Sequence, residues 1–443
     1  MRPKERYKKL KEHLLEENPV LVEAIKEYEE LDGVAHEIGF IEKESTYTEE
    51  ISWWPLISVL GTFSAGKSSF INEFLQTKLQ STGNQAVDDK FTVICYTKSP
   101  EPITLPGVAL DADPRFPFYD ISKEIEKIED NETAVNRYLQ LKGVNSERLK
   151  GKILIDSPGF DADVQRDETL KITKHIIDLS DLVLIFFDAR HPEPGAMRDT
   201  LNHLVEVAQN HKDSDKILYI LNQIDTCHKE DNLEDIIGAW QRALSQKGIV
   251  SGRFYAIYNE SVSELKENEA GRLKKRKDAD LSEIIQKIEK VSVDRAYRIV
   301  KNVGTKAKEL LKDIRELKDM LQRYKKIMLF ADALMLISLA AGGLWLNIAG
   351  LDSYFGVYAG VSIAVFLLLH FKLKRVVAST LANKIENPQV KRAFVKQSAW
   401  FRSTFGAPAR VSQEKYVNRL KDLIEESKNF IQKLNDQFVT LKS

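Results

Sequence analysis

The sequence predicts a doubly wound α/β nucleotide-binding domain joined to an all-α stalk and bundle that carries a membrane-spanning helical hairpin. Three observations support this fold class. A glycine-bordered loop lies between a short apolar run and a helical stretch, which is the context of a phosphate-binding loop (P-loop). Further short apolar runs alternate with helical stretches, as in a parallel sheet covered on both faces. Two apolar segments, 327–349 and 354–371, are long enough to cross a bilayer.

The loop follows the apolar run 56–60 and leads into a helical stretch that begins near Lys67. Its glycines let backbone N–H groups turn inward around a phosphate, and the positive end of the helix points at the same place. Lys67 can reach the β- and γ-phosphates, and the Ser68 hydroxyl can bind Mg²⁺. The nucleotide-binding residues predicted in this loop are Gly61, Ser64, Ala65, Gly66, Lys67, Ser68 and Ser69.

Two later motifs also follow apolar runs. Asp156 ends the run 152–155 and can hold Mg²⁺ through water, while Gly159 leaves a backbone N–H free for a γ-phosphate. Asn222 and Asp225 come after another such run, at the place where guanine-nucleotide proteins read the base. Each motif alone is also an ordinary turn or loop. Their order at the carboxyl ends of strands predicts one nucleotide site.

With these motifs the sequence resembles the dynamin superfamily of large nucleotide-hydrolysing membrane proteins, and within it the EH-domain ATPases. The narrower likeness rests on the segments 106–118 and 184–189, and the resemblance covers residues 50 to 260. It implies a G-domain that hydrolyses GTP or ATP with Mg²⁺, self-assembles into a homo-oligomer, and remodels, fuses or divides membranes. By this resemblance the catalytic residues are Ser64, Lys67 and the nearby Thr92.

The sequence departs from the family pattern at three points. Val87 and Asp88 occupy the place of the switch threonine that binds Mg²⁺ and positions the attacking water, and Thr92 is shifted from it. Gln223 replaces the lysine that packs over the base. No Asp-x-Asp-x-Asp-Gly calcium loop of an EH domain follows.

We therefore expect slow basal turnover that increases on self-assembly. GTP is preferred because of Asn222 and Asp225, although the EH-domain relatives use ATP with a similar motif. The alternative is a non-hydrolysing or ATP-dependent membrane scaffold or tether.

The composition also argues against several other kinds of protein and site. A formal charge of −1 with 30% charged residues argues against a nucleic-acid partner, which needs a basic excess. Only Cys95 and Cys227 occur, so we expect a reducing compartment and no disulfide framework. Cys227-His228 is interpreted as a loop dipeptide rather than a zinc site. The basic first residues lack the long apolar core of a signal peptide.

The apolar segments are predicted to form a hairpin, because only four residues separate them. Each contains ten Leu, Ile, Val or Phe residues, which contribute about −3 to −6 kcal/mol to insertion, against at most about 3 kcal/mol for Asp332. Basic residues flank both outer ends, so both termini and the nucleotide domain are expected on the cytosolic side. The alternative is a water-soluble hairpin buried in a helical core.

The chain thus divides into five predicted parts. The nucleotide domain contains a charged insert, 120–150, that is expected to be helical. The parts are an N-terminal helical arm at 1–50, the nucleotide domain at 51–260, a helical stalk at 261–326, the hairpin at 327–371 and a C-terminal bundle segment at 372–443.

Overall fold

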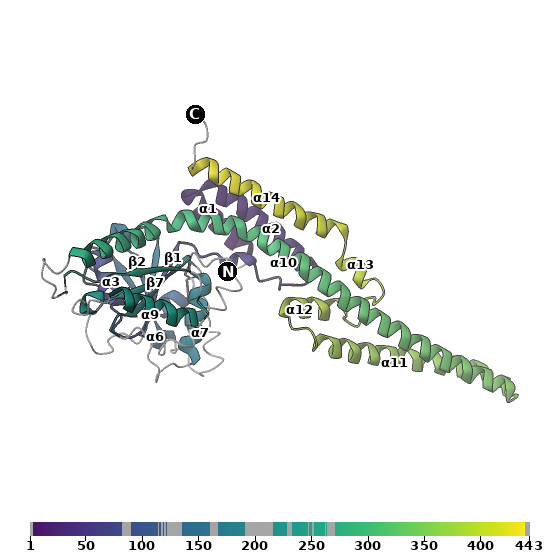
Figure 1. Cartoon of the computed structure of the whole chain (residues 1–443). Coiled ribbons are helices and arrows are strands. Elements are labelled where there is room, and N and C mark those ends of the chain that lie inside the picture. The colour runs from purple at the N-terminus through teal and green to yellow at the C-terminus, as the bar shows by residue number, and fades with distance from the viewer. Residues whose placement is uncertain are drawn as a thin grey trace. The chain divides into compact units, whose positions relative to one another are not determined.

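The structure is a computed structural model with two compact units (Figure 1). The nucleotide unit is Glu50–Arg295, and the helical unit combines Met1–Glu49 with Ala296–Ser443. Helix α10, Gly271–Ile348, contributes to both. The residues that the structure describes are 3–81, 90–113, 115–116, 118, 121, 135–159, 167–190, 216–227, 233–246, 248–249, 252–261, 263 and 271–438.

The nucleotide unit is built on a sheet in which eight strands are described, in the order β3-β4-β2-β5-β1-β6-β7-β8. The strands are β1 (Leu56–Gly61), β2 (Phe91–Tyr96), β3 (Ile103–Pro106), β4 (Leu139–Val144), β5 (Ile153–Asp156), β6 (Leu182–Asp188), β7 (Ile217–Asn222) and β8 (Arg253–Ala256).

The prediction of a wholly parallel sheet is wrong at one side. Strands β5, β1, β6, β7 and β8 are parallel, but β2 pairs antiparallel with β5, and β3 antiparallel with β4. An apolar run shows that a strand is buried and not which way it runs. The sequence therefore could not give the direction of the added strands.

Strand β4 also corrects the expected helical insert at 120–150. Leu139 and Leu141 are buried while Gln140 and Lys142 are half-buried, which is the period of a strand with one covered face. Only a short helix, α6 (Val135–Tyr138), and a 3₁₀ turn at Glu147–Leu149 flank it among the described residues of the insert. The many charges of this segment hid the alternation.

Helices cover both faces of the sheet. On one face, α3 (Lys67–Leu75) packs with the beginning of α10 against Ile57 and Val59. On the other, α7 (Asp167–Leu179) and α9 (Leu233–Gln246) pack against Leu56 and Leu60 respectively. A short α4 (Val108–Asp111) lies beside β3 and β4.

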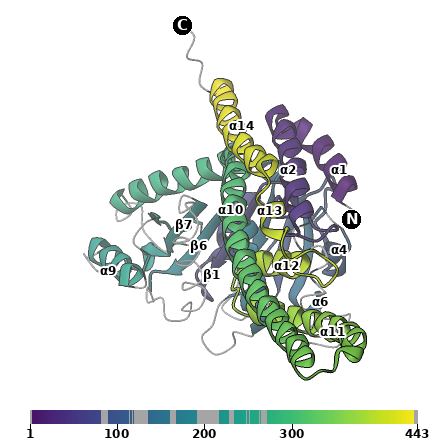
Figure 2. The same ribbon diagram turned by 90° about the vertical axis from the view of Figure 1, so that its right-hand side faces the viewer.

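The helical unit brings the N-terminal arm and the C-terminal helix together (Figures 1 and 2). The N-terminal arm is broken into two helices: α1 ends at Glu17, and Asn18 caps α2 by accepting from the Val20 N–H. The Ser427 hydroxyl donates to the Val300 carbonyl at 3.0 Å. Besides α10, the helices are α1 (Pro3–Glu17), α2 (Pro19–Ile38), α11 (Phe355–Ala382), α12 (Pro388–Gln397), α13 (Ala407–Val411) and α14 (Glu414–Phe438).

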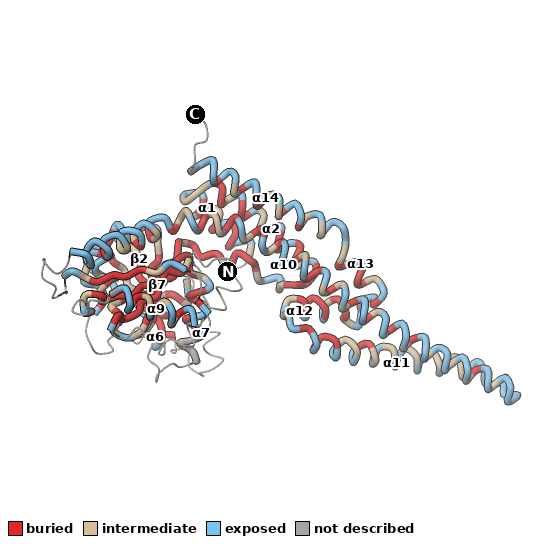
Figure 3. The backbone as a smooth tube through the Cα atoms, viewed as in Figure 1, coloured by how far each residue is buried: buried red, intermediate tan, exposed pale blue. Residues whose placement is uncertain are grey.

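The end of α10 and α11 form an antiparallel hairpin. His370 Nδ1 lies 2.8 Å from Asp332 Oδ1, and the Tyr358 hydroxyl donates to the Leu339 carbonyl at 2.5 Å. A Cβ at Gly342 would lie 2.3 Å from that hydroxyl, so the two helices meet at a glycine. In the most apolar stretch of α10 17% of the residues are buried, and in that of α11 none is. Figure 3 accordingly colours most of the hairpin as exposed or intermediate. The alternative of a hairpin wrapped inside a helical core is therefore wrong.

Candidate nucleotide-binding site

The phosphate loop connects β1 to α3 at the carboxyl edge of the parallel strands. Gly66 precedes the first helical residue with a left-handed φ of +83°, and no side chain caps the helix. The first N–H groups of α3 thus lack a side-chain acceptor, which is the state in which a helix N-terminus binds an anion. Ser64 is also left-handed, with φ +58°, a conformation that few non-glycine residues adopt.

Two glycines of the loop are required by close contacts. A Cβ at Gly66 would lie 2.3 Å from the Asn222 side-chain nitrogen, and one at Gly61 would lie 2.6 Å from the Phe186 carbonyl oxygen. Gly159 is similar, because its Cβ would lie 2.9 Å from the Cα of Phe63. Strand β6 and the segment after β5 therefore approach the phosphate loop closely with their backbones, and β7 approaches it with the Asn222 side chain.

Lys67 is buried and turned into the loop. Its ammonium donates to the carbonyls of Gly61 at 3.0 Å and Thr62 at 3.2 Å. Burial lowers the pKa of Lys67, and the charge of nearby Asp156 opposes that shift. A cation held in this position is well placed to exchange these carbonyls for phosphate oxygens.

Asp156 ends β5 inside a row of polar side chains on the α3 face of the sheet. Thr92 lies opposite it across the β2–β5 pair, and Gln140 lies beside Thr92 on β4. The Gln140 amide donates to the Thr92 hydroxyl at 2.7 Å. Thr92 is thus a buried sheet residue next to the predicted metal ligand. The switch positions Val87 and Asp88 lie outside the described residues.

Gln80 is a site residue that the sequence analysis missed. Its side-chain amide donates to Asp156 Oδ2 at 2.6 Å, and its carbonyl oxygen accepts from the Lys142 ammonium at 2.6 Å. The Asn72 side chain, one turn before the end of α3, fixes the Gln80 backbone through both its N–H and its C=O. Gln80 therefore holds the carboxylate that the sequence assigns to Mg²⁺.

The base-reading segment is tied directly to the phosphate loop. Asn222 Nδ2 donates to the Ala65 carbonyl at 2.9 Å, and Gln223 Nε2 donates to the Ser64 carbonyl at 2.5 Å. From the sequence, Gln223 was expected only to lack the lysine side chain that packs over the base in the family. In the structure the Gln223 side chain also supports the phosphate loop through its bond to Ser64, and its own backbone is left-handed, with φ +64°.

The remaining predicted residues lie around the same edge. Asp225 is half-buried in a 3₁₀ turn, Ile224–Cys227, directly after β7. Ser68 and Ser69 lie in the first turn of α3, and the Asn259 amide donates to the Ser69 hydroxyl at 2.9 Å. Asn259 follows β8 and was not singled out from the sequence, because a lone asparagine after a strand carries no motif.

The donor set suits Mg²⁺ better than a transition metal. The predicted ligands, the Ser68 hydroxyl and the Asp156 carboxylate, are oxygen donors. Within the described part of the chain no three His, Cys, Asp or Glu side chains gather as a metal-binding group. Mg²⁺ in nucleotide sites takes one or two protein ligands together with substrate phosphates and water.

A mixed sheet with a glycine-bordered loop after β1, a carboxylate at the end of β5 and an Asn-x-x-Asp segment after β7 defines a P-loop nucleotide-binding domain. Residues 57–224 match the model of the dynamin family. This part of the chain is therefore similar to the dynamin family.

Curated relatives match the same part of the chain. EH domain-containing protein 2 of Rattus norvegicus is 25% identical over 199 residues, which are 43% of this chain and 34% of that protein. EH domain-containing protein 1 of Bos taurus is 24% identical over 178 residues, 39% of this chain and 31% of that protein. The chain thus spans about a third of the length of the curated relatives it matches.

A solved structure aligns over a longer stretch but less closely. It comes from an oligomerised bacterial dynamin pair described as a mechanism for long-range sensing and tethering of membranes. The alignment covers 88% of this chain and 86% of that one, at 12% identity and a TM-score of 0.38. A score of this size does not establish a common arrangement of the two chains.

Proposed function

We propose that the protein is a membrane-anchored dynamin-like nucleoside triphosphatase that hydrolyses GTP, or ATP, slowly and faster on self-assembly. The supporting observation is the pair of hydrogen bonds from Asn222 and Gln223 to the carbonyls of Ala65 and Ser64. These bonds join the predicted phosphate end and base end of the site, so that one nucleotide can be held by both.

Each residue has a role that follows from its place. Lys67 neutralises the β- and γ-phosphates, the backbone N–H groups at Gly66 and Gly159 face phosphate oxygens, and Asp225 reads the base. Mg²⁺, when bound, neutralises charge on the phosphates, with Ser68 and Asp156 as its protein ligands.

Hydrolysis is assigned to the residues of the loop and to the sheet beside it. Ser64 orients groups at the γ-phosphate from the strained turn of the loop. Thr92 contributes through the Asp156 side of the site, since the two face each other across β2 and β5. Self-assembly through the nucleotide domain and the helical stalk would raise the rate, as in dynamin-like proteins.

The hairpin is proposed as the membrane anchor, with both termini and the nucleotide domain in the cytosol. Pairing with His370 lowers the cost of placing Asp332 in an apolar segment, because each group has a polar partner there. The contact between Gly342 and Tyr358 is of the small-residue kind that lets membrane helices approach closely. The anchored protein would then couple its nucleotide state to membrane remodelling, fusion or fission.

A nucleotide-regulated scaffold or tether without hydrolysis is the second candidate. It is favoured by the absence of a switch threonine at Val87 and Asp88, and by the bond that already occupies the Thr92 hydroxyl. Such a protein would bind nucleotide and self-associate without releasing phosphate.

Phosphate release separates the two candidates. We would measure it with GTP and with ATP over a series of protein concentrations, with and without liposomes, using Lys67→Ala as the background control. The triphosphatase predicts a specific activity that rises with concentration or lipid. Nucleotide binding with no release above that control would support the scaffold, and extraction of the protein from membranes by carbonate would contradict the anchor.

A further inference from the structure

The loop between α12 and α13, residues 398–406, exposes three large aromatic side chains. Trp400 is 69% exposed, Phe401 70% and Phe405 45%. Bulky apolar side chains gathered in one short loop mark a surface that another apolar phase covers. We call residues 398–406 the aromatic loop.

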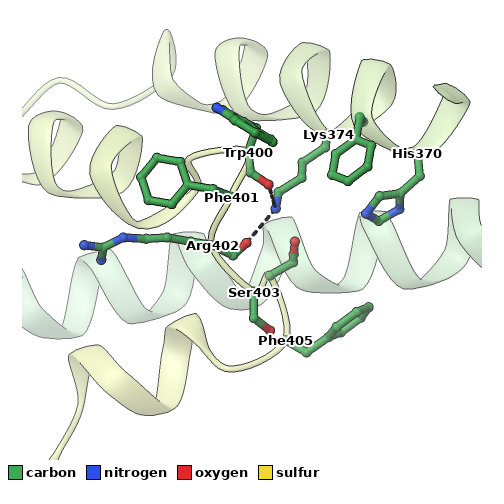
Figure 4. A pocket seen from close by; sticks show the side chains of 9 residues that line it. His370, Lys374, Trp400, Phe401, Arg402, Ser403 and Phe405 are labelled. Atoms are coloured by element: carbon green, nitrogen blue, oxygen red, sulfur yellow. Dashed lines mark hydrogen bonds between the residues drawn. The ribbon is translucent and has the colours of Figure 1, made fainter. Parts of the chain in front are cut away.

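The aromatic loop is fastened to α11 by a buried cation. The Lys374 ammonium donates to the carbonyls of Trp400 at 3.0 Å and Arg402 at 2.6 Å, as Figure 4 shows. The Trp400 ring also meets the ring of Phe371 edge-on, with centroids 6.3 Å apart. Phe371 is the last residue of the second apolar segment, so the loop lies at the level where that segment ends.

The loop is joined to the first apolar segment at the same level. Tyr324, three residues before that segment begins, has its hydroxyl near the Thr404 side chain, and its ring packs edge-on against Phe394 of α12. The aromatic loop therefore lies beside the outer ends of both helices of the hairpin.

Charge and shape around the loop are those of a membrane interface. A cavity of about 410 Å³ between the loop and α11 is lined by the rings of Phe371, Trp400 and Phe405 and by Lys374 and Arg402. A tryptophan ring such as that of Trp400, which has a polar N–H edge, settles at the headgroup level of a bilayer, and cations there attract anionic headgroups. Further basic residues surround the same level, namely Arg323, Lys325, Lys326, Lys372 and Arg375.

We propose that the aromatic loop is a second membrane contact, which inserts Trp400 and Phe401 into the headgroup region of the bilayer that the hairpin crosses, with a phospholipid headgroup at the adjoining cavity. This inference rests on the proposed membrane anchor. A soluble partner is a poorer fit, since it would have to reach the loop at the depth where phospholipid headgroups already lie beside the hairpin.

Fluorescent labels on the full-length protein test the proposal. In a Cys95→Ser, Cys227→Ser background, a polarity-sensitive dye is attached to F401C, to I337C in the first apolar segment, or to E425C on the exposed face of α14 as the matched control. The protein is placed in vesicles of phosphatidylcholine and phosphatidylglycerol, some carrying a nitroxide quencher near the headgroup. We expect a blue shift and a loss of more than about half the emission at 401, and neither at 425.

The label at 337 separates failure of the inference from failure of the anchor. If 337 lies in lipid while 401 emits as in water, the aromatic loop proposal is overturned and the anchor stands. If 337 emits as in water, the anchor is overturned, and quenching at 401 would then still support a lipid contact of the loop. A blue shift at 401 without quenching by lipid means that protein covers the loop, which also overturns the proposal.

Lys374→Met provides a second test that does not depend on the dye alone. Without the ammonium the loop loses both bonds to α11, so quenching at 401 should fall while that at 337 is unchanged. Unchanged quenching at 401 would overturn the role given to Lys374.

Discussion

Gly66→Ala tests whether the phosphate loop and the base-reading segment form one site. An alanine there must keep a left-handed φ of +83°, which costs about 1–2 kcal/mol. Its Cβ would also lie 2.3 Å from the Asn222 amide, and moving that amide breaks its bond to the Ala65 carbonyl, about 0.5–1.5 kcal/mol more. The expected loss of folding stability in Gly66→Ala is therefore about 1.5–3.5 kcal/mol.

Gly151→Ala is the matched control. Gly151 is left-handed as well, with φ +71°, but a Cβ there meets nothing within 4 Å, so only the backbone cost of about 1–2 kcal/mol applies. A shift of roughly 2–4 °C in melting temperature per kcal/mol separates the two variants for a unit of this size.

Nucleotide binding gives the second readout. Titration with a fluorescent nucleotide should show affinity reduced at least about tenfold in Gly66→Ala, a loss of about 1.4 kcal/mol, and unchanged in Gly151→Ala. Wild-type affinity in Gly66→Ala would refute the coupling of the loop to Asn222.

Three further predictions concern the base, the metal ligand and the helical unit. Asp225→Ala should weaken GTP binding by roughly 10- to 100-fold and leave ATP binding unchanged in competition titrations; an equal loss for both nucleotides would contradict a base-reading role. Gln80→Ala should raise the Mg²⁺ concentration needed for half-maximal nucleotide binding by roughly tenfold, because Asp156 loses its orienting donor, whereas Gln140→Ala should not. Burial and the neighbouring Glu426 carboxyl group raise the pKa of Glu27, so the folded state keeps a proton that the unfolded state releases above about pH 4.3. Stability of the helical unit should thus fall as pH rises from there through the raised pKa, and Glu426→Gln should flatten this fall in melting curves; parallel curves for the two proteins would count against the pairing.

Much of the site was predictable because its chemistry fixes residue types and short spacings. The loop 61–69, Asp156 and Asn222 follow from rules for strands, glycines and phosphate, and the structure brings them to one edge of the sheet. Gln80 was not predictable, because its bond to Asp156 joins positions 76 residues apart and no motif marks it.

For the helices and for the antiparallel strands too, features set by a local residue pattern were predictable, and contacts between distant positions were not. The hairpin follows from two apolar segments with a short link, while the contact of Asp332 with His370 needs the helices to be set in register. The antiparallel direction of β2 is a matter of how the chain connects, which local composition does not encode. The segment that forms β4 holds one charge, Lys142, but it lies within a charged insert whose composition indicated a helix.

Binding of nucleotide by wild-type protein and by Lys67→Ala, measured by calorimetry with GTP and ATP in the presence of Mg²⁺, shows whether the loop at 61–69 holds a nucleoside triphosphate. The structure places this ammonium inside the loop, bonded to Gly61 and Thr62, where it can turn to the β- and γ-phosphates. We expect the wild type to bind at least one of the two nucleotides and a folded Lys67→Ala protein, checked by its melting curve, to bind neither. Equal affinity in the two proteins would mean that this loop is not the phosphate site.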